Sequence, residues 1–342
     1  MSMTTHERPG VYSDYDTSTV VSSSGSGQIV GLTAVCAGGE AGTLYTLNRY
    51  EEAVTAFGQE ENLTELVRLL LLNGAAQVRA VPVASQEDYE AAFQLLEGED
   101  NVALVLCDST DVTVQQKLRD SVCAASEARR ERIAVVCGGA EESVDNLVQR
   151  AEQLNSERVV LLAPGDDSCL LAAAVAGAIA GETDPAVPLG GAELKGLGSL
   201  EIQYNDNEID TLVRGGVMPL ERVSGVTSVV RAVTTRTKTG EAADTTWREL
   251  TTIRIVDNVI PTLRDALRAK FRRTKNTEQT RGAIRSQVIL ELENKLNREI
   301  ITSYENVTVQ ADTENPTVCL VDFTFTVAHG LNQIWLSAHI TV

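Results

Sequence analysis

The chain has 342 residues, of which 43% are hydrophobic, and this is enough apolar material to fill the cores of about two domains. Its 48 acidic and 29 basic residues give a formal net charge of −19, which argues against a general nucleic-acid binder, because phosphate contacts need clustered Lys and Arg. No apolar run reaches the roughly 18 residues that cross a bilayer, and the N-terminus is polar, so we expect neither membrane insertion nor export by a signal peptide.

Residues 1–27 offer little with which to build a core. Arg8-Pro9-Gly10-Val11-Tyr12 is extended or turn-like, and a Ser/Thr-rich run follows it. One interpretation is a disordered leader. The other is an arm that becomes ordered on a partner, with Val11, Tyr12, Val20 and Val21 as its anchors.

From residue 28 to residue 190, apolar runs typical of strands alternate with segments of helical periodicity. The expected strands are 29–35, 78–83, 102–106, 133–136 and 158–162, and the expected helices are 61–73, 86–96, 112–130, 142–154 and 168–180. This alternation predicts an α/β domain with a largely parallel sheet. A run of Gly and Pro over 181–191 marks its end. The six cysteines show no CxxC spacing and several lie in apolar runs, so we expect reduced, buried thiols.

Domains of this class often bind nucleotides where strands end, so that function has to be considered. Cys137-Gly138-Gly139-Ala140 follows a strand, but it matches no phosphate-binding motif and we favour a plain turn. Acidic loops follow Leu106 and Leu162, and they include Asp108, Asp111, Asp166 and Asp167. These carboxylates could bind a metal, yet Asp is an ordinary helix N-cap, and we favour capping. The three histidines lie near the chain ends, so no Ser/His/Asp arrangement can be placed in these loops.

The C-terminal part combines a strand at 227–233 with two long helices and two closing strand-like runs. The first helix is expected over 252–272, with Pro261 causing either a kink or a start near Asn258. The second is expected over 277–303, and strands over 307–309 and 317–327 follow. From 246 to 304 there are 12 basic and 7 acidic residues, a net charge of +5 in an acidic chain. The basic residues gather near the helix junction: Arg264, Arg268, Lys270, Arg272, Arg273, Lys275, Arg281 and Arg285.

Residues 333–342 alternate without interruption between apolar and other side chains. Ile334, Leu336, Ala338, Ile340 and Val342 fall on one face, which is the period of a half-buried strand. Because chain ends fray unless something holds them, we expect this strand to join a sheet in its own subunit or in another.

An ordered series of short segments over most of the chain resembles the tail sheath proteins of contractile phage tails and phage-tail-like injection particles. The segments are Arg8-Pro9-Gly10-Val11-Tyr12, Phe57-Gly58, Leu72 to Val81, Ala172 to Gly177, Asp184 to Pro188, Gly215-Gly216-Val217-Met218-Pro219, Trp247-Arg248-Glu249-Leu250, Arg254-Ile255-Val256-Asp257, Asn276 and Thr280-Arg281. No single segment is diagnostic, and the order of the series carries the resemblance. The chain is short for this family, so large surface insertions are expected to be absent.

The resemblance implies a fold and a function. The expected fold is an N-terminal arm (1–27), an α/β domain (28–190), an α+β sheath core of a sheet and two helices (191–328), and a C-terminal strand arm (329–342). Subunits would stack as six-membered rings around an inner tube, their arms would add strands to neighbouring sheets, and contraction would drive the tube through a cell envelope. The expected partners are further copies of the chain, the inner tube protein, and baseplate and tail terminator proteins. Neither a cofactor nor catalysis is implied, and the expected place is a virion tail or tail-like particle assembled in the bacterial cytoplasm.

Two matters stay open at this level. The basic band from Arg264 to Arg285 is either a solvated face or a surface that faces the tube, and we hypothesise the latter. The alternative functions are an α/β nucleotide- or metal-dependent hydrolase that uses the loops after Leu106 and Leu162, and a static shell subunit with a single lattice.

Overall fold

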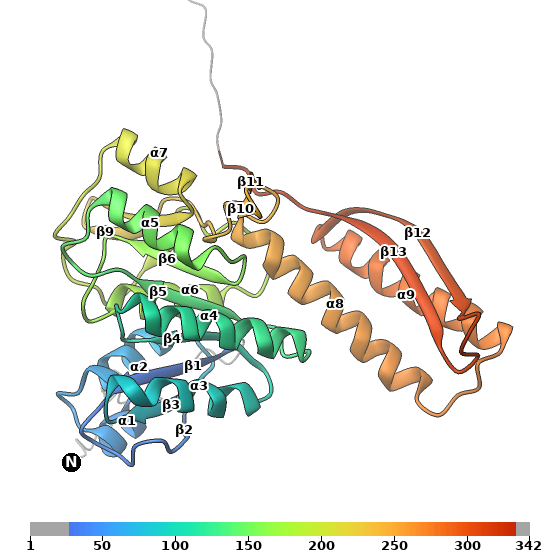
Figure 1. Ribbon diagram of the computed structural model, residues 1–342, viewed down its shortest axis with the longest axis horizontal. Coiled ribbons are helices and arrows are strands. Elements are labelled where there is room, and N and C mark those ends of the chain that lie inside the picture. The colour runs from blue at the N-terminus through green and yellow to red at the C-terminus, as the bar shows by residue number, and fades with distance from the viewer. Residues whose placement is uncertain (1–26, 333–342) are drawn as a thin grey trace, which may run out of the picture.

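A computed structural model describes residues 27–332 of the chain as two units joined by one long helix (Figure 1). The strands are β1 Ile29–Val35, β2 Tyr45–Leu47, β3 Gln77–Val83, β4 Val102–Cys107, β5 Ile133–Cys137, β6 Val159–Ala163, β7 Glu193–Leu194, β8 Val217–Val223, β9 Val226–Val229, β10 Lys238–Thr239, β11 Ala242–Ala243, β12 Ile301–Ala311 and β13 Cys319–Val327. The α-helices are α1 Tyr50–Phe57, α2 Asn62–Asn73, α3 Tyr89–Gly98, α4 Val112–Glu127, α5 Val144–Leu154, α6 Leu170–Gly181, α7 Asp206–Arg214, α8 Leu250–Phe271 and α9 Glu278–Asn297.

The larger unit is built on a nine-stranded sheet with the order β2-β3-β1-β4-β5-β6-β8-β9-β7. The strands from β3 to β8 in this order are parallel, and the pairs β2–β3, β8–β9 and β9–β7 are antiparallel. Every residue of β5 and β6 is buried, as expected for central parallel strands covered on both faces. The largely parallel sheet expected from the sequence is therefore confirmed.

Helices cover both faces of this sheet. Helices α1, α2 and α6 pack on one face, and α3, α4, α5 and α7 pack on the other. Small residues let α6 approach α2 closely: a Cβ atom on Gly177 would lie 2.7 Å from the carbonyl oxygen of Leu70. The Ala- and Gly-rich sequence of α6 thus serves close packing of two helices under the sheet.

The sheet does not end at the expected domain boundary after residue 190. Three of its strands, β7, β8 and β9, come later in the chain, and β8 pairs with β6 through Leu161–Val217 and two further positions. The Gly/Pro run therefore marks a connection within the unit. Turn residues indicate where a chain bends, but not which sheet the next strand joins.

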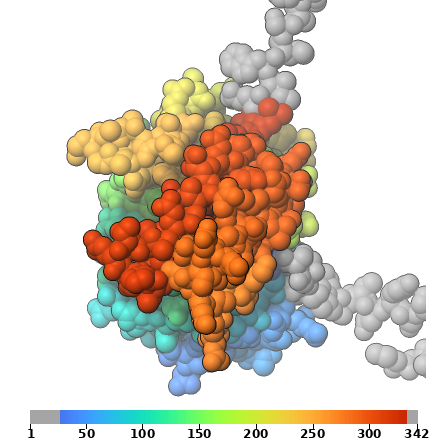
Figure 2. Space-filling model, turned by 90° about the vertical axis from the view of Figure 1, so that its right-hand side faces the viewer, coloured from blue at the N-terminus to red at the C-terminus, as the bar shows by residue number. Residues whose placement is uncertain are grey.

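The smaller unit consists of α8, α9 and a two-stranded antiparallel sheet of β12 and β13, which we call the hairpin sheet. Its own core contains Ile255, Val259, Leu263, Val288, Leu292, Ile300, Ile301 and Val307. Figure 1 shows α8 leading away from the larger unit to α9 and the hairpin sheet, and Figure 2 shows these orange and red elements in front of the larger unit, seen from their own side. No helix within 27–332 is long and apolar enough to cross a membrane.

The first long helix of this unit lies close to its expected place, and the second ends earlier than expected. Helix α8 begins at Leu250 and continues through Pro261 to Phe271, so the expected bounds of 252–272 are confirmed within two residues and the alternative of a start near Asn258 is wrong. Helix α9 ends at Asn297, and residues 301–303, expected to be helical, already belong to β12. The chain leaves the helix through Glu299, whose φ of 58° is left-handed.

Candidate assembly surfaces

The hairpin sheet exposes two long strand edges. Strands β12 and β13 have 11 and 9 residues, and within the described part of the chain they pair only with each other. The edges of the nine-stranded sheet are short by comparison, because β2 has three residues and β7 has two. Short edge strands are a common protection against unwanted pairing, whereas long ones offer rows of free N–H and C=O groups. In the described part of the chain, the hairpin sheet therefore has the long strand edges on which a further strand could pair.

The inward face of β13 is only partly covered. Its inward residues alternate along the strand and are all half-buried: Cys319, Val321, Phe323, Phe325 and Val327. On β12, by contrast, Ile301 and Val307 are fully buried, and the strand lies along α9. Apolar surface therefore remains accessible beside β13.

The basic residues expected to form one band divide into two groups. Arg264 pairs with Glu131 at 2.6 Å, Arg285 donates to the carbonyl of Val307, Arg281 donates to Asn276, and Lys270 donates to Gln287. Arg268, Arg272, Arg273 and Lys275 are exposed and form no ion pair within residues 27–332. We call the last three, which lie between α8 and α9, the basic tip. That these residues face a tube stays a prediction.

The first half of α8 is fixed to the larger unit by apolar and polar contacts. Leu250 and Ile253 enter the core beneath the sheet. Asp257 forms a bidentate pair with Arg158, with N–O distances of 2.8 and 3.0 Å, and both side chains are about six-sevenths buried. Burial raises the pKa of Asp257, and the Arg158 guanidinium offsets part of this rise. The pair thus joins α8 to the residue before β6.

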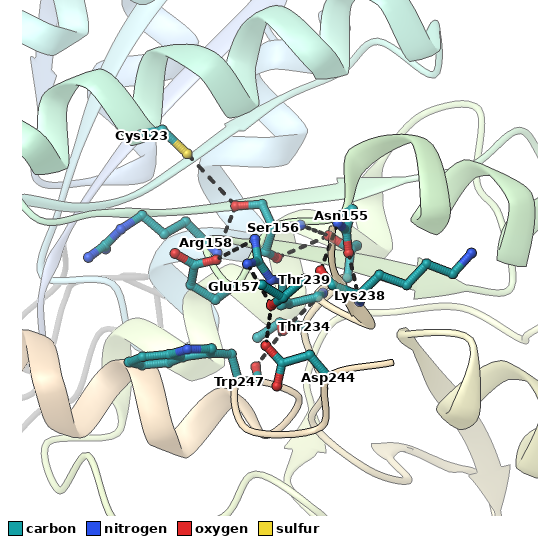
Figure 3. Close-up of polar contacts among 12 residues, drawn as sticks. Cys123, Asn155, Ser156, Glu157, Arg158, Thr234, Lys238, Thr239, Asp244 and Trp247 are labelled. Carbon is teal, nitrogen blue, oxygen red and sulfur yellow. Dashed lines mark hydrogen bonds and ion pairs between the residues drawn. The ribbon is translucent and has the colours of Figure 1, made fainter. Parts of the chain in front are cut away.

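A polar network holds the segment that leads into α8 (Figure 3). The Asn155 side chain accepts from the Lys238 backbone N–H at 3.2 Å and donates to its carbonyl at 3.0 Å. The buried Thr235 hydroxyl accepts from the Ser156 N–H and donates to the Ser156 carbonyl, both at 3.0 Å. Thr234 donates to the Trp247 carbonyl at 2.8 Å. The two bonds to Ser156 are buried, so they satisfy backbone groups that would otherwise lack partners away from water.

The ion pair between Glu131 and Arg264 gives a pH-dependent contribution to stability. Burial raises the pKa of Glu131, but the hydrogen bond and charge of Arg264, together with a backbone hydrogen bond and the charge of Arg158, outweigh it, and the pKa lies below its ordinary value of 4.5. A lowered folded-state pKa contributes stability that is present above the unfolded pKa and is lost as the pH falls through the folded one. We expect Glu131→Gln to lower the free energy of unfolding by about 1 kcal/mol at pH 7.

The measurement is urea unfolding of the parent and the variant at several pH values. The difference between them should shrink as the pH falls below 4.5. Glu141→Gln, at an exposed position without an ion pair in the described chain, serves as the control and should change little. A difference that persists undiminished at pH 3 would contradict the role of the charge.

The acidic loops of the hydrolase alternative act as helix caps and structural acceptors. Asp111 accepts from the Thr113 N–H at 2.7 Å at the start of α4, and Asp166 accepts from the Leu171 N–H at 3.0 Å at the start of α6. The favoured capping interpretation is confirmed for Asp111, whereas the N-cap position of α6 is Cys169 and Asp166 reaches the Leu171 N–H from the preceding loop. Asp108 follows β4 at the point where the strand order reverses between β1 and β4, which is the usual ligand crevice of such sheets. Its half-buried carboxylate accepts from Tyr89 and from the Val35 N–H. Within residues 27–332, no group of three or more His, Cys, Asp or Glu could hold a metal.

The predicted arm residues lie outside the described residues, so their placement stays a prediction: Val11, Tyr12, Val20, Val21, Ile334, Leu336, Ala338, Ile340 and Val342. Sequence reasoning also missed the Arg158–Asp257 pair. Its signal was present, because Leu250, Ile253, Arg254 and Asp257 share one helical face. Charged residues on an apolar face indicate a buried polar contact.

Two family models match this chain. One, described as the phage tail sheath protein central domain, matches residues 83–235, and one described as the phage tail sheath C-terminal domain matches residues 242–341. The curated tail sheath protein of Bacillus phage SP01 is 27% identical over 253 residues, which are 70% of this chain and 43% of that protein. The chain therefore spans about two fifths of the length of the curated relative it matches.

Solved structures share the fold along nearly the whole chain. A chain of the anti-feeding prophage baseplate matches with a TM-score of 0.75 and 14% identity, covering 99% of this chain and 100% of that one. The contracted helical sheath of the same prophage gives a TM-score of 0.72 at 16% identity, with 98% and 99% covered. The sheath tail protein of Desulfitobacterium hafniense gives 0.70 at 12% identity, with 93% and 100% covered.

Proposed function

Because this chain belongs to the phage tail sheath family, we propose that it is the structural subunit of a contractile tail sheath in a virion tail or tail-like particle. Its copies stack as six-membered rings around an inner tube, and contraction drives that tube through a target envelope. Further partners are baseplate and tail terminator proteins at the two ends. The chain assembles in the bacterial cytoplasm, and its role is mechanical rather than catalytic.

The observation that carries this proposal is the hairpin sheet with two long open edges in a molecule whose larger sheet has short ones. Arms of neighbouring copies add strands to these edges, so that backbone hydrogen bonds provide affinity and alternating side chains fix the register. Residues 333–342 suit this role. Their five alternating apolar side chains match the alternating, half-buried inward face of β13.

Contraction in this proposal is a change between two packings of rigid subunits. Head-to-tail contacts that do not close generate filaments, and the arms act as the hinges between copies. Rigidity of each subunit rests on α8, which places Leu250 and Ile253 in the core of the larger unit and Val259 and Leu263 in the core of the smaller unit. Energy is stored in the extended lattice at assembly, so no nucleotide is needed.

Co-assembly with the inner tube protein tests this function. Electron microscopy should find sheathed tubes in one helical lattice, and a shorter, wider lattice after mild acid or urea treatment. A single lattice under all conditions would favour a static shell, and discrete small particles would favour the hydrolase alternative.

The basic tip and Arg268 are proposed to face the tube, because a contact that must release suits charge pairs that are individually weak and screened by salt. We expect Arg272→Glu/Arg273→Glu to leave sheath polymers intact but to reduce their assembly on the tube by at least about tenfold. Each lost or reversed pair changes the affinity by up to about 1 kcal/mol, and the effect repeats in every subunit.

The measurement is the yield of sheathed tubes after co-expression, scored by electron microscopy. Arg49→Glu/Lys195→Glu makes the same charge change at exposed positions on the larger unit and should assemble normally. Normal tail assembly by the Arg272/Arg273 variant would contradict the tube-facing assignment.

A further inference from the structure

A polar groove runs between α8 and the larger unit. Its volume is about 920 Å³. One wall is the second half of α8, including Pro261, Asp265 and Arg268, and the other comes from the starts of β1 and β4 and from the segment before β5. Gly27 and Gln28, at the beginning of the described chain, line the groove as well.

The point at which the chain enters this groove is fixed. The Gln28 N–H donates to the Ala180 carbonyl at 2.9 Å, and the Gln28 carbonyl accepts from the Ala76 N–H at 3.0 Å. A Cβ atom at position 27 would lie 2.0 Å from the Gly74 carbonyl oxygen, so only glycine fits there. The residues before Gly27 therefore start from an anchored position at the groove wall.

The charges of the groove balance within its walls. The lining has four cations and four anions: Arg129, Arg130, Arg264 and Arg268, and Asp100, Glu131, Asp257 and Asp265. Several are already paired, as Arg130 is with Asp100 and Arg264 with Glu131. An occupant thus needs hydrogen-bonding groups and small side chains but no net charge. Residues 17–26 of this chain, Thr-Ser-Thr-Val-Val-Ser-Ser-Ser-Gly-Ser, have that composition.

The length of the segment also fits. From Asp257 to Arg268 is eleven helical steps, or about 17 Å at 1.5 Å per residue. The five residues 22–26 span about 17 Å when extended at about 3.3 Å per residue. A chain that leaves Gly27 along α8 would therefore clear the groove near Arg268, and Val20 and Val21 would be the first residues beyond it.

We propose that residues 22–26 lie in this groove along α8 of their own subunit. The arm then departs from the far end of α8 rather than from Gly27. As a consequence that rests on the proposed function, Val20 and Val21 start beside the smaller unit, and tension on the arm acts on α8, the helix that joins both units.

Disulfide trapping in the unpolymerised full chain tests the proposal. The background is Cys123→Ser/Cys319→Ser, which removes the two half-buried thiols. Ser23→Cys is combined either with Asp265→Cys in the groove or with Asn48→Cys as the matched control. Asn48 is exposed and accepts a hydrogen bond from Gln77 of β3. Gln77 pairs in register with Ile29, two residues after Gly27, so an N-terminal segment that is not docked in the groove can reach Asn48 as well.

With oxidised glutathione as the oxidant, we expect the groove pair to form its intrachain disulfide at least about tenfold faster than the control pair, because docking raises the effective concentration. Equal rates, or a faster control pair, would overturn the proposal. Mixing with ¹⁵N-labelled chains adds a second criterion: linkage between differently labelled chains would assign the groove to the arm of another copy. Sheath polymerisation is measured separately by electron microscopy. Because the trapping uses the unpolymerised chain, its result does not depend on whether the chain forms a sheath.

Discussion

Leu336→Asp/Ile340→Asp should abolish sheath polymers while leaving the subunit folded. Both positions belong to the apolar set of the alternating segment 333–342, which we propose to add to a neighbour's hairpin sheet. Fully burying a leucine or isoleucine contributes about 1.5–3 kcal/mol, so losing two weakens each docking by at least about 3 kcal/mol, or roughly 100-fold. Burying a carboxylate among apolar side chains without a partner adds a further free-energy cost to docking.

The period of two provides the matched control. Ser337→Asp/Thr341→Asp places the same charges on the opposite face of the same segment, and it should polymerise nearly as well as the parent. Pelleting by ultracentrifugation measures polymer, and circular dichroism verifies the fold. Equal loss in both variants would mean that charge, and not the face of a strand, decides assembly.

Asp257→Ala should lower the free energy of unfolding by about 3–5 kcal/mol. The substitution leaves the Arg158 guanidinium without its bidentate partner in a site where its side chain is only 13% exposed. Breaking one side of a buried ion pair has this magnitude because the remaining charge stays desolvated. The measurement is urea unfolding at neutral pH.

A double variant separates the charge from the packing. Arg158→Met/Asp257→Leu replaces both partners by apolar side chains and should recover most of the lost stability, since apolar replacements of buried pairs are often neutral. If the free energy of unfolding of Asp257→Ala lay within about 1 kcal/mol of that of the parent, the pair would be no stronger than a surface ion pair. It would also remove the main polar support for a rigid joint between the units.

Local periodicity was sufficient to predict most of the larger unit. The apolar runs of β4, β5 and β6 and the helical spacing of α2 and α4 fall within a few residues of their predicted bounds. Strand β8 was not predicted, because Gly215, Gly216 and Pro219 resemble a turn. What makes Val217–Val223 a strand is pairing with β6 and β9, and pairing between distant segments leaves no mark on local composition.

The assembly surfaces were predictable in kind but not in detail. The concentration of basic residues near the α8–α9 junction was visible in the sequence, and the basic tip and Arg268 belong to it as exposed residues without an ion pair in the described chain. Arg264 could not be told from its neighbours, because Glu131 is 133 positions away and only folding brings the two together. The groove beside α8 is likewise a product of how the two units pack.

Negative-stain electron microscopy of the purified chain, intact and lacking residues 333–342, tests the central claim most directly. The account predicts long hollow tubes from the intact chain and their loss on truncation, with the truncated chain still folded. Tubes that persist without residues 333–342 would contradict assembly through the C-terminal strand. Discrete small particles from both chains would contradict the sheath function itself.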